Sequence, residues 1–99
     1  MFGMHKFIQQ LQQSEGHLRK IVLSVERGGG AVGIVMNILQ EVVEVRIGSQ
    51  APSLLAEGRL GAVLAEAYNQ ALRESRRQLK EEVSRLTGIT NLPDLPGIF

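Results

Sequence analysis

One uninterrupted stretch constrains the fold more than any other part of the chain. Residues 62–87 contain neither proline nor glycine and consist mostly of Ala, Leu, Glu, Gln, Arg and Lys, which are strong helix formers. Gly88 follows directly, and a glycine in this position is a typical helix stop. The sequence therefore predicts one long helix, of about 39 Å at 1.5 Å per residue.

Apolar residues on this segment recur at three- and four-residue multiples, which places them in one stripe. We expect the stripe to contain Leu64, Tyr68, Leu72, Leu79, Val83 and Leu86, with Ala71 and Ser75 between them. A short strand is only ~17–20 Å long, so the second half of the helix should extend beyond any sheet it covers. We interpret this overhang as a sign that the stripe packs on a partner chain.

Four cations on the same segment are the main candidate functional residues. Arg73, Arg76, Arg77 and Lys80 are three or four residues apart and fall roughly opposite the apolar stripe. Cations spaced in this way can meet DNA phosphates, and each neutralised phosphate releases counterions. The alternative is a solvated helix face, because the segment also carries four glutamates. These are Glu66, Glu74, Glu81 and Glu82.

Alternating apolar residues predict three strands before the long helix, over residues 20–27, 31–37 and 41–47. Their short connections indicate an antiparallel meander. Gly28–Gly30 is read as the first hairpin turn, since a phosphate-binding loop would be followed by a helix. The residues expected to face inward are Ile21, Leu23, Val25, Val32, Ile34, Met36, Val43, Val45 and Ile47.

The opposite face of this sheet also carries apolar residues. Val22, Val35 and Val42 alternate there with polar and charged side chains. A solvated sheet face is usually more polar, so partial cover by a second subunit is one reading. Scattered exposed valines are the other, because single exposed apolar residues are common.

The remaining segments complete an α+β pattern within a single domain spanning residues 1–99. Residues 4–13 predict a first helix, which either ends near Ser14 or continues through Leu18, and residues 53–57 predict a helical turn. The tail over residues 92–99 contains two prolines that exclude a helix. It either docks on the protein or stays loose.

Composition limits the possible functions. The net charge is only +1, so an anion-binding surface must come from local clustering. The absence of cysteine excludes disulfides and thiolate metal sites. No apolar run approaches 18 residues and no signal-peptide core is present, so we expect a cytoplasmic protein. His5 and His17 lack partners at metal-ligand spacing, and no nucleophile signature is present, so we expect no metal, cofactor, small-molecule substrate or enzymatic activity.

Several stretches, in this order, resemble the YbaB/EbfC family of bacterial nucleoid-associated proteins. They are residues 1–3, the 28–30 turn leading into Val32 and Ile34, residues 42–47, Asn69–Arg73, residues 86–88 and the ending at 95–99. The resemblance implies an α-β-β-β-α protomer that forms a tight homodimer. It also implies a non-enzymatic protein that binds double-stranded DNA with little sequence preference, associated with the nucleoid.

The resemblance carries over one DNA-binding residue, Arg73 in the Asn69–Arg73 segment. We add the other three cations of the helix because they share its charged face. Near the first helix the candidates are Lys6, Arg19 and Lys20. The alternative is a dimeric protein-interaction module of the same fold with weak or no DNA binding. The low net charge and the few cations of the first helix favour that alternative.

Overall fold

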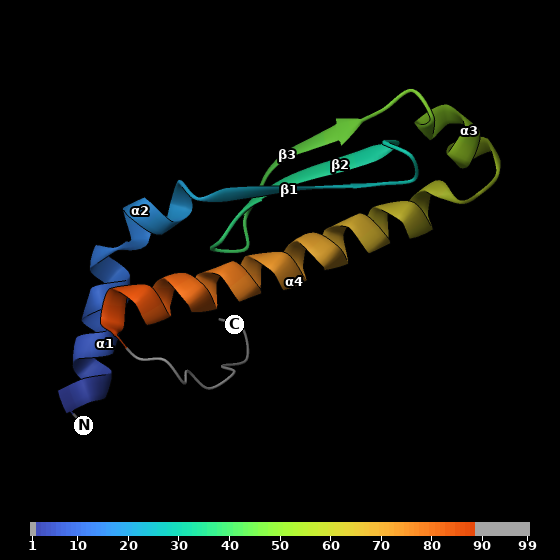
Figure 1. The fold of residues 1–99 in the computed structure, drawn as a ribbon. Helices are drawn as coiled ribbons and strands as arrows, with labels where there is room; N and C mark the ends of the chain where they lie inside the picture. Colours follow the sequence, from blue (N-terminus) through green and yellow to red (C-terminus); the bar gives the residue numbers. More distant parts are fainter. Residues whose placement is uncertain (1, 89–99) are drawn as a thin grey trace.

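The computed structural model describes residues 2–88 and has the predicted α+β architecture (Figure 1). The predicted tail lies outside the described residues. A three-stranded antiparallel sheet in the order β1-β2-β3 lies against one long helix. The elements are α1 (Phe2–Gln13), α2 (Glu15–Arg19), β1 (Val22–Arg27), β2 (Val32–Asn37), β3 (Val42–Ile47), α3 (Ala51–Ala56) and α4 (Leu60–Thr87).

The first helical segment is broken rather than continuous. α1 ends at Gln13, and Ser14 lies at the start of α2, where its carbonyl accepts a hydrogen bond from the Leu18 amide over 2.9 Å. Leu18 is almost fully buried. The short second helix therefore serves to turn one apolar side chain into the protein.

The glycine turn between β1 and β2 is confirmed as a hairpin connection. Gly28 has a φ of +68°, and a Cβ at this position would lie 2.8 Å from Val63 Cγ1 of α4. Only glycine combines this backbone conformation with so close an approach. The turn is consequently packed directly on α4, and this fixes the end of β1 against the helix.

The main core lies between α4 and the first two strands. Its members are Leu23, Val25, Val32, Ile34 and Met36 from the sheet and Val63, Ala67 and Ala71 from the helix. The small helix residues let the backbone of α4 approach the strands closely. The core is therefore built from a large-residue sheet face and a small-residue helix face.

The buried stripe of α4 differs from the expected one. The buried residues are four apart throughout: Val63, Ala67, Ala71, Ser75, Leu79 and Val83. Tyr68 and Leu64 are instead about two-fifths exposed, at 41% and 42%, and Leu72 and Leu86 are half-buried. A four-residue step advances by about 40° more than one turn, so the buried row winds slowly around α4. The prediction followed large side chains, whereas in the first half of the helix the close sheet buries small ones within the single chain.

The overhanging half of α4 is covered by the chain itself. Leu79 and Val83 form a second cluster with Leu18 of α2 and Ile38 of the β2–β3 turn. In Figure 1, α2 lies above the C-terminal half of α4, beyond the end of the sheet. The interpretation of the overhang as a sign of a partner chain was therefore wrong, because α2 and the turn supply the cover.

The apolar side of β3 is left open. Val45 pairs with Ile34 and Ile47 with Val32, so both lie on the face that α4 covers elsewhere, yet they are 48% and 65% exposed. Val43, also expected to face inward, is the extra residue where the register shifts, and it is exposed. Val45 and Ile47 therefore face the predicted side of the sheet, but they are not buried within the chain because α4 packs mainly on β1 and β2.

The opposite sheet face is more polar than expected. Since Val42 pairs with Met36 through the bulge, it belongs to the helix side. The far side of the sheet carries Glu44 and Arg46 in an ion pair of 2.8 Å; Val35 there is half-buried, and Val22 is 52% exposed. The excess of exposed apolar residues therefore lies on the helix side of β3.

Candidate nucleic-acid interface

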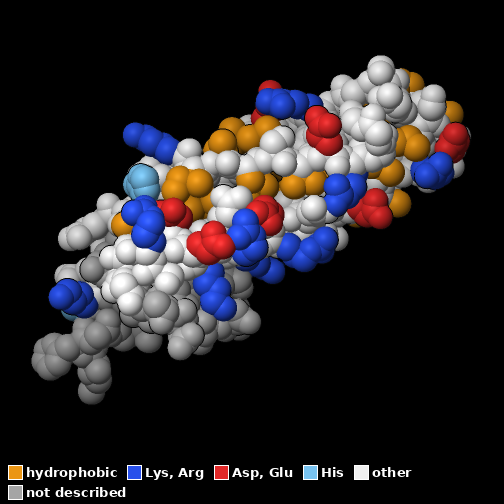
Figure 2. Space-filling model, viewed as in Figure 1, with side chains coloured by type: hydrophobic (Ala, Val, Ile, Leu, Met, Phe, Trp, Pro, Cys, Tyr) orange, Lys and Arg blue, Asp and Glu red, His pale blue; other side chains and the backbone are white. Residues whose placement is uncertain are grey.

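The four predicted cations of α4 lie on two neighbouring rows of the helix. Arg73 and Arg77 are four residues apart on the exposed row opposite the core, whereas Arg76 and Lys80 lie on the flank and are half-buried. Figure 2 shows Lys and Arg side chains along the helix side of the molecule. The four cations therefore differ in exposure, and they also differ in the carboxylates that lie next to them.

Arg77 is held by two carboxylates. It forms ion pairs with Glu74 and with Glu81, the latter over 2.6 Å. The hydrogen bond from Arg77 lowers the pKa of Glu74 below its ordinary value, with a smaller contribution from Gln78. The same Glu74 bond is the main cause of the raised pKa of Arg77. The charge of Arg77 is therefore largely neutralised at the surface.

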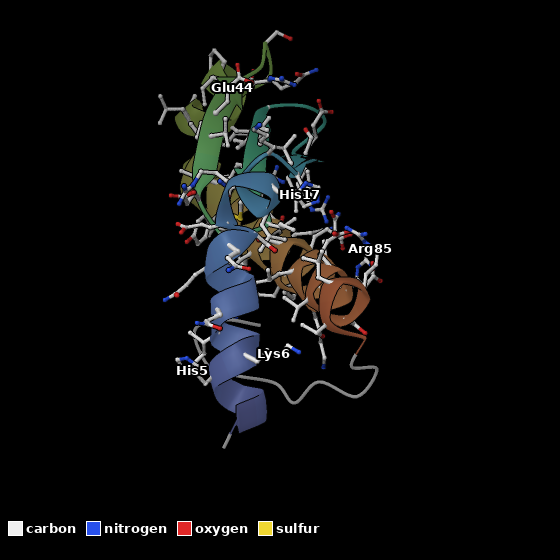
Figure 3. All side chains as sticks on the ribbon, turned by 90° about the vertical axis from the view of Figure 1, so that its left-hand side faces the viewer. His5, Lys6, His17, Glu44 and Arg85 are labelled. Atoms are coloured by element: carbon white, nitrogen blue, oxygen red, sulfur yellow. The ribbon has the colours of Figure 1, made fainter. Side chains whose placement is uncertain are left out.

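Arg85 is neutralised in the same way near the end of α4. It pairs with Glu82 over 2.6 Å, and its hydrogen bond is the main cause of the lowered pKa of Glu82. His17 of α2 approaches the same carboxylate at 3.9 Å. Figure 3 shows His17 on α2 and Arg85 on the last turns of α4. This cluster joins α2 to α4.

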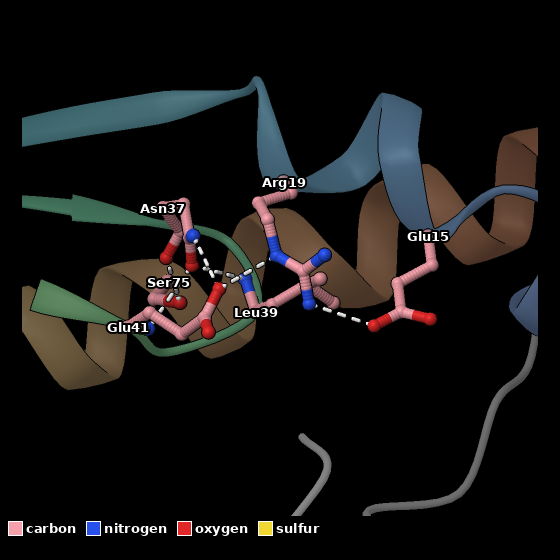
Figure 4. A network of polar contacts seen from close by, with 6 residues as sticks. All are labelled: Glu15, Arg19, Asn37, Leu39, Glu41 and Ser75. Atoms are coloured by element: carbon pink, nitrogen blue, oxygen red, sulfur yellow. Dashed lines mark hydrogen bonds and ion pairs between the residues drawn. The ribbon is translucent and has the colours of Figure 1, made fainter. Parts of the chain in front are cut away.

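Arg19, a predicted DNA-binding residue, lies in a structural network (Figure 4). Its guanidinium reaches Glu15 at 2.7 Å and Glu41 at 3.0 Å. The pKa of Glu41 is lowered, first by a hydrogen bond from Asn37 and then by Arg19. Arg19 therefore links α2 to the β2–β3 turn, and both of its carboxylate partners compete with any phosphate.

The centre of this network is Asn37, which sequence reasoning missed. Its side-chain oxygen accepts hydrogen bonds from the amides of Leu39 and Glu41, each over 3.0 Å, and its side-chain nitrogen donates to Glu41 over 2.8 Å. The buried hydroxyl of Ser75 donates to the Asn37 carbonyl over 2.9 Å. An Asn after a strand signals a turn, but its link to α4 is invisible in the sequence.

Arg73 differs from these paired arginines. Within residues 2–88 it has no carboxylate partner. It lines a cleft of about 230 Å³ together with Arg27, Glu66, Asn69 and Gln70. Arg27 comes from the end of β1 and, among the described residues, donates only to the carbonyl of Glu26, over 2.8 Å. Sequence reasoning missed Arg27 because a lone arginine at the end of a strand carries no signal of its neighbours.

The other predicted cations lie apart from this cleft. Arg76 is half-buried, and its Nε has no hydrogen-bond partner in the described part of the chain. Lys6 and Lys20 are exposed, on α1 and just after α2. Figure 3 shows Lys6 on the helix that projects beyond the sheet. The structure therefore does not gather the predicted cations into one patch.

Other kinds of site find little support in residues 2–88. No three His, Asp or Glu side chains among them are placed to hold a metal ion. None of the helices in this part of the chain has the length and apolar character needed to cross a membrane.

Comparison with known proteins assigns the chain to a family. The model of the YbaB/EbfC DNA-binding family matches residues 1–90. The chain belongs to the YbaB/EbfC DNA-binding family. The resemblance seen in the sequence is thus confirmed, and the description of the family is one of DNA binding and names no reaction.

Two curated relatives extend this YbaB/EbfC assignment. A protein of Legionella pneumophila (strain Corby) is 39% identical over 95 residues, which cover 93% of this chain and 82% of the relative. A protein of Persephonella marina is 32% identical, covering 92% and 84% of the two chains. Both are named nucleoid-associated proteins.

A solved structure supports the fold independently of the family match. The crystal structure of an uncharacterised protein from Helicobacter pylori matches with a TM-score of 0.68 at 22% sequence identity. The match covers 80% of this chain and 92% of that one. The likeness concerns the fold alone.

Proposed function

We propose that the protein binds double-stranded DNA with little sequence preference, as a homodimer acting in the nucleoid and without enzymatic activity. Membership of a DNA-binding family and the names of the two relatives support the nucleic-acid partner. The observation that carries the proposal is Arg73, which lies exposed in the family segment Asn69–Arg73 and has no carboxylate partner within residues 2–88.

The low sequence preference follows from the kind of contact that this surface offers. Arginine and lysine side chains on a helix flank reach phosphates, and phosphate contacts position a protein without reading bases. No recognition-helix motif is present in the sequence. Binding should therefore depend on salt far more than on base sequence.

The cations should contribute unequally to the affinity for DNA. Arg77 and Arg19 each hold two carboxylates, so a phosphate would have to displace existing partners. Arg73 has no such competitor among the described residues. We therefore expect Arg73 to matter more for DNA binding than Arg77, although the two lie one turn apart on the same row of α4.

The homodimer is supported by the open side of β3. Exposed apolar residues on this side come from both β3 and α4, and they are Val42, Val45, Ile47, Leu64 and Tyr68. A second copy of the chain could cover this surface by presenting the same surface in return, as two-fold dimers do.

Fluorescence anisotropy with a random duplex of about 30 base pairs, at several salt concentrations, tests DNA binding. We expect affinity that falls steeply with salt. Arg73→Ala should weaken binding and reduce the slope by about 0.9 per lost phosphate contact. Arg77→Ala removes the same charge from the same row and is the matched control, with a smaller expected effect.

Two results would count against this assignment. Equal losses in the two variants would show that carboxylate pairing does not decide which arginine binds. Absence of binding by the wild type even at ~50 mM salt would remove the DNA function. It would instead favour a dimeric protein-interaction module of the same fold.

A further inference from the structure

We propose that the cleft between the end of β1 and α4 is a seat for one phosphate of the DNA backbone, clamped between Arg27 and Arg73. The inference rests on the proposed function and gives it a specific site. It adds Arg27, a strand residue, to the helix cations that the sequence suggests.

The two arginines are held near each other by the packing of the glycine turn. Arg27 is the last residue of β1, and Gly28 directly after it packs against Val63 of α4. Arg73 lies farther along the same helix and faces the same cleft. Sheet edge and helix therefore bring together two cations that are 46 positions apart in the sequence.

Arg27 and Arg73 differ from the other exposed arginines of the described chain in their lack of a carboxylate partner. Other exposed arginines of the described chain hold carboxylates: Arg46 pairs with Glu44, Arg59 with Glu57 and Arg85 with Glu82. Within residues 2–88, Arg27 and Arg73 pair with none, although Glu66 lines the same cleft. Two guanidiniums and one carboxylate leave the cleft with an excess positive charge.

The lining chemistry fits a phosphate. Guanidinium groups present several N–H donors in a plane and bind phosphate oxygens in bidentate fashion. The side-chain amides of Asn69 and Gln70 add further donors. The volume of about 230 Å³ is smaller than the ~300 Å³ at which ordinary ligand pockets begin. The cleft is therefore suited to a single phosphate rather than to a whole nucleotide.

Glu66 allows the proposal to be tested by a gain in DNA affinity as well as by a loss. Glu66 lines the cleft and its negative charge would repel a phosphate, so removing that charge should improve binding. Glu66→Gln keeps the size of the side chain and removes only the charge. Loss of folding cannot imitate a gain in affinity, whereas it could imitate the loss expected for an arginine variant.

The experiment compares Arg27→Ala, Arg27→Lys and Glu66→Gln with the wild type in the salt-dependent anisotropy assay. Arg27→Ala should weaken binding several-fold on random and on A·T-rich duplexes alike, and should lower the salt slope by about 0.9 for each cleft in contact. Arg27→Lys should recover only part of the affinity, because lysine lacks the planar fork. Glu66→Gln should tighten binding several-fold.

Arg59→Ala is the control, because Arg59 carries the same charge at the surface but is paired with Glu57 over 3.1 Å. It should bind DNA nearly as the wild type does. If the wild type binds DNA while Arg27→Ala and Glu66→Gln both match it, the phosphate seat is wrong and the proposed function stands. If the wild type does not bind DNA at low salt, the proposed function itself fails.

Discussion

Asn37 joins three parts of the protein through its buried side-chain amide and its backbone carbonyl. It is only 2% exposed, closes the β2–β3 turn through the amides of Leu39 and Glu41, and receives the Ser75 hydroxyl of α4 on its carbonyl. The turn it shapes also carries Ile38, which covers the second half of α4. A single side chain thus supports both the turn and the second core cluster.

Replacing Asn37 with alanine should lower the free energy of unfolding by about 2–4 kcal/mol, because two backbone amides lose their acceptor in a part-buried site. Urea unfolding followed by circular dichroism measures this change. Ser75→Ala is the milder comparison, at about 1 kcal/mol, since the Asn37 carbonyl also accepts from the Gln40 amide over 3.1 Å. Equal stability of Asn37→Ala and the wild type would show that the network is dispensable.

Glu41 gives this network a dependence on pH. The hydrogen bond from Asn37, followed by that from Arg19, lowers the pKa of Glu41 in the folded protein. A lowered folded pKa means that the stabilisation is present above the unfolded pKa of about 4.3 and is lost as the pH falls through the folded value. Urea midpoints between neutral pH and about pH 3 should therefore fall less steeply in Glu41→Gln than in the wild type. Parallel curves would contradict the role of Glu41.

At the scale of elements, the sequence predicts where α4 lies better than which side of it is buried. Its helix formers fix its extent, and Gly88 ends it with a φ of +74°, as expected of a stop residue. The buried side depends on how closely the sheet approaches, which no local pattern records. The pattern placed Tyr68 in the apolar stripe, whereas the residues buried within the single chain are Ala67 and Ala71.

Small residues at the contact between α4 and the sheet should therefore be essential. Ala71→Leu should destabilise the protein by about 1–3 kcal/mol, because extra methylenes have no space in a packed core. Ala65→Leu makes the same change on an exposed part of the same helix and should alter stability by less than about 0.5 kcal/mol. Urea unfolding distinguishes the two. A tolerated leucine at position 71 would show that the helix can move away from the sheet.

Which segment packs on the second half of α4 likewise depends on contacts between residues far apart in the chain. The sequence gives α2 only as a weak continuation of the first helix, so nothing in it indicates that Leu18 packs on Leu79 and Val83. The cleft of Arg27 and Arg73 escaped prediction for the same reason, because its halves come from a strand and a helix far apart in the chain. Local periodicity finds elements, whereas tertiary packing decides which of their residues meet.

At the scale of the whole molecule, the open side of β3 decides what kind of assembly is possible. Leu79 is not a suitable position for a test of the dimer, because it is 4% exposed in the core of one chain and Leu79→Asp would bury an unpaired charge there. Val45 is the better position. It lies on β3, on the side that α4 leaves open, and is half-exposed in the single chain.

Val45→Asp should shift the protein from dimer to monomer in light scattering at micromolar concentration, since an unpaired buried charge is strongly destabilising in an interface. Ser24→Asp adds the same charge to the opposite face of the sheet and should keep the mass of two 10.9 kDa chains. A monomeric wild type would contradict the homodimer. A dimeric Val45→Asp protein would place the interface elsewhere. Because a monomer presents one set of cations instead of two, its salt slope for DNA should be about half that of the dimer.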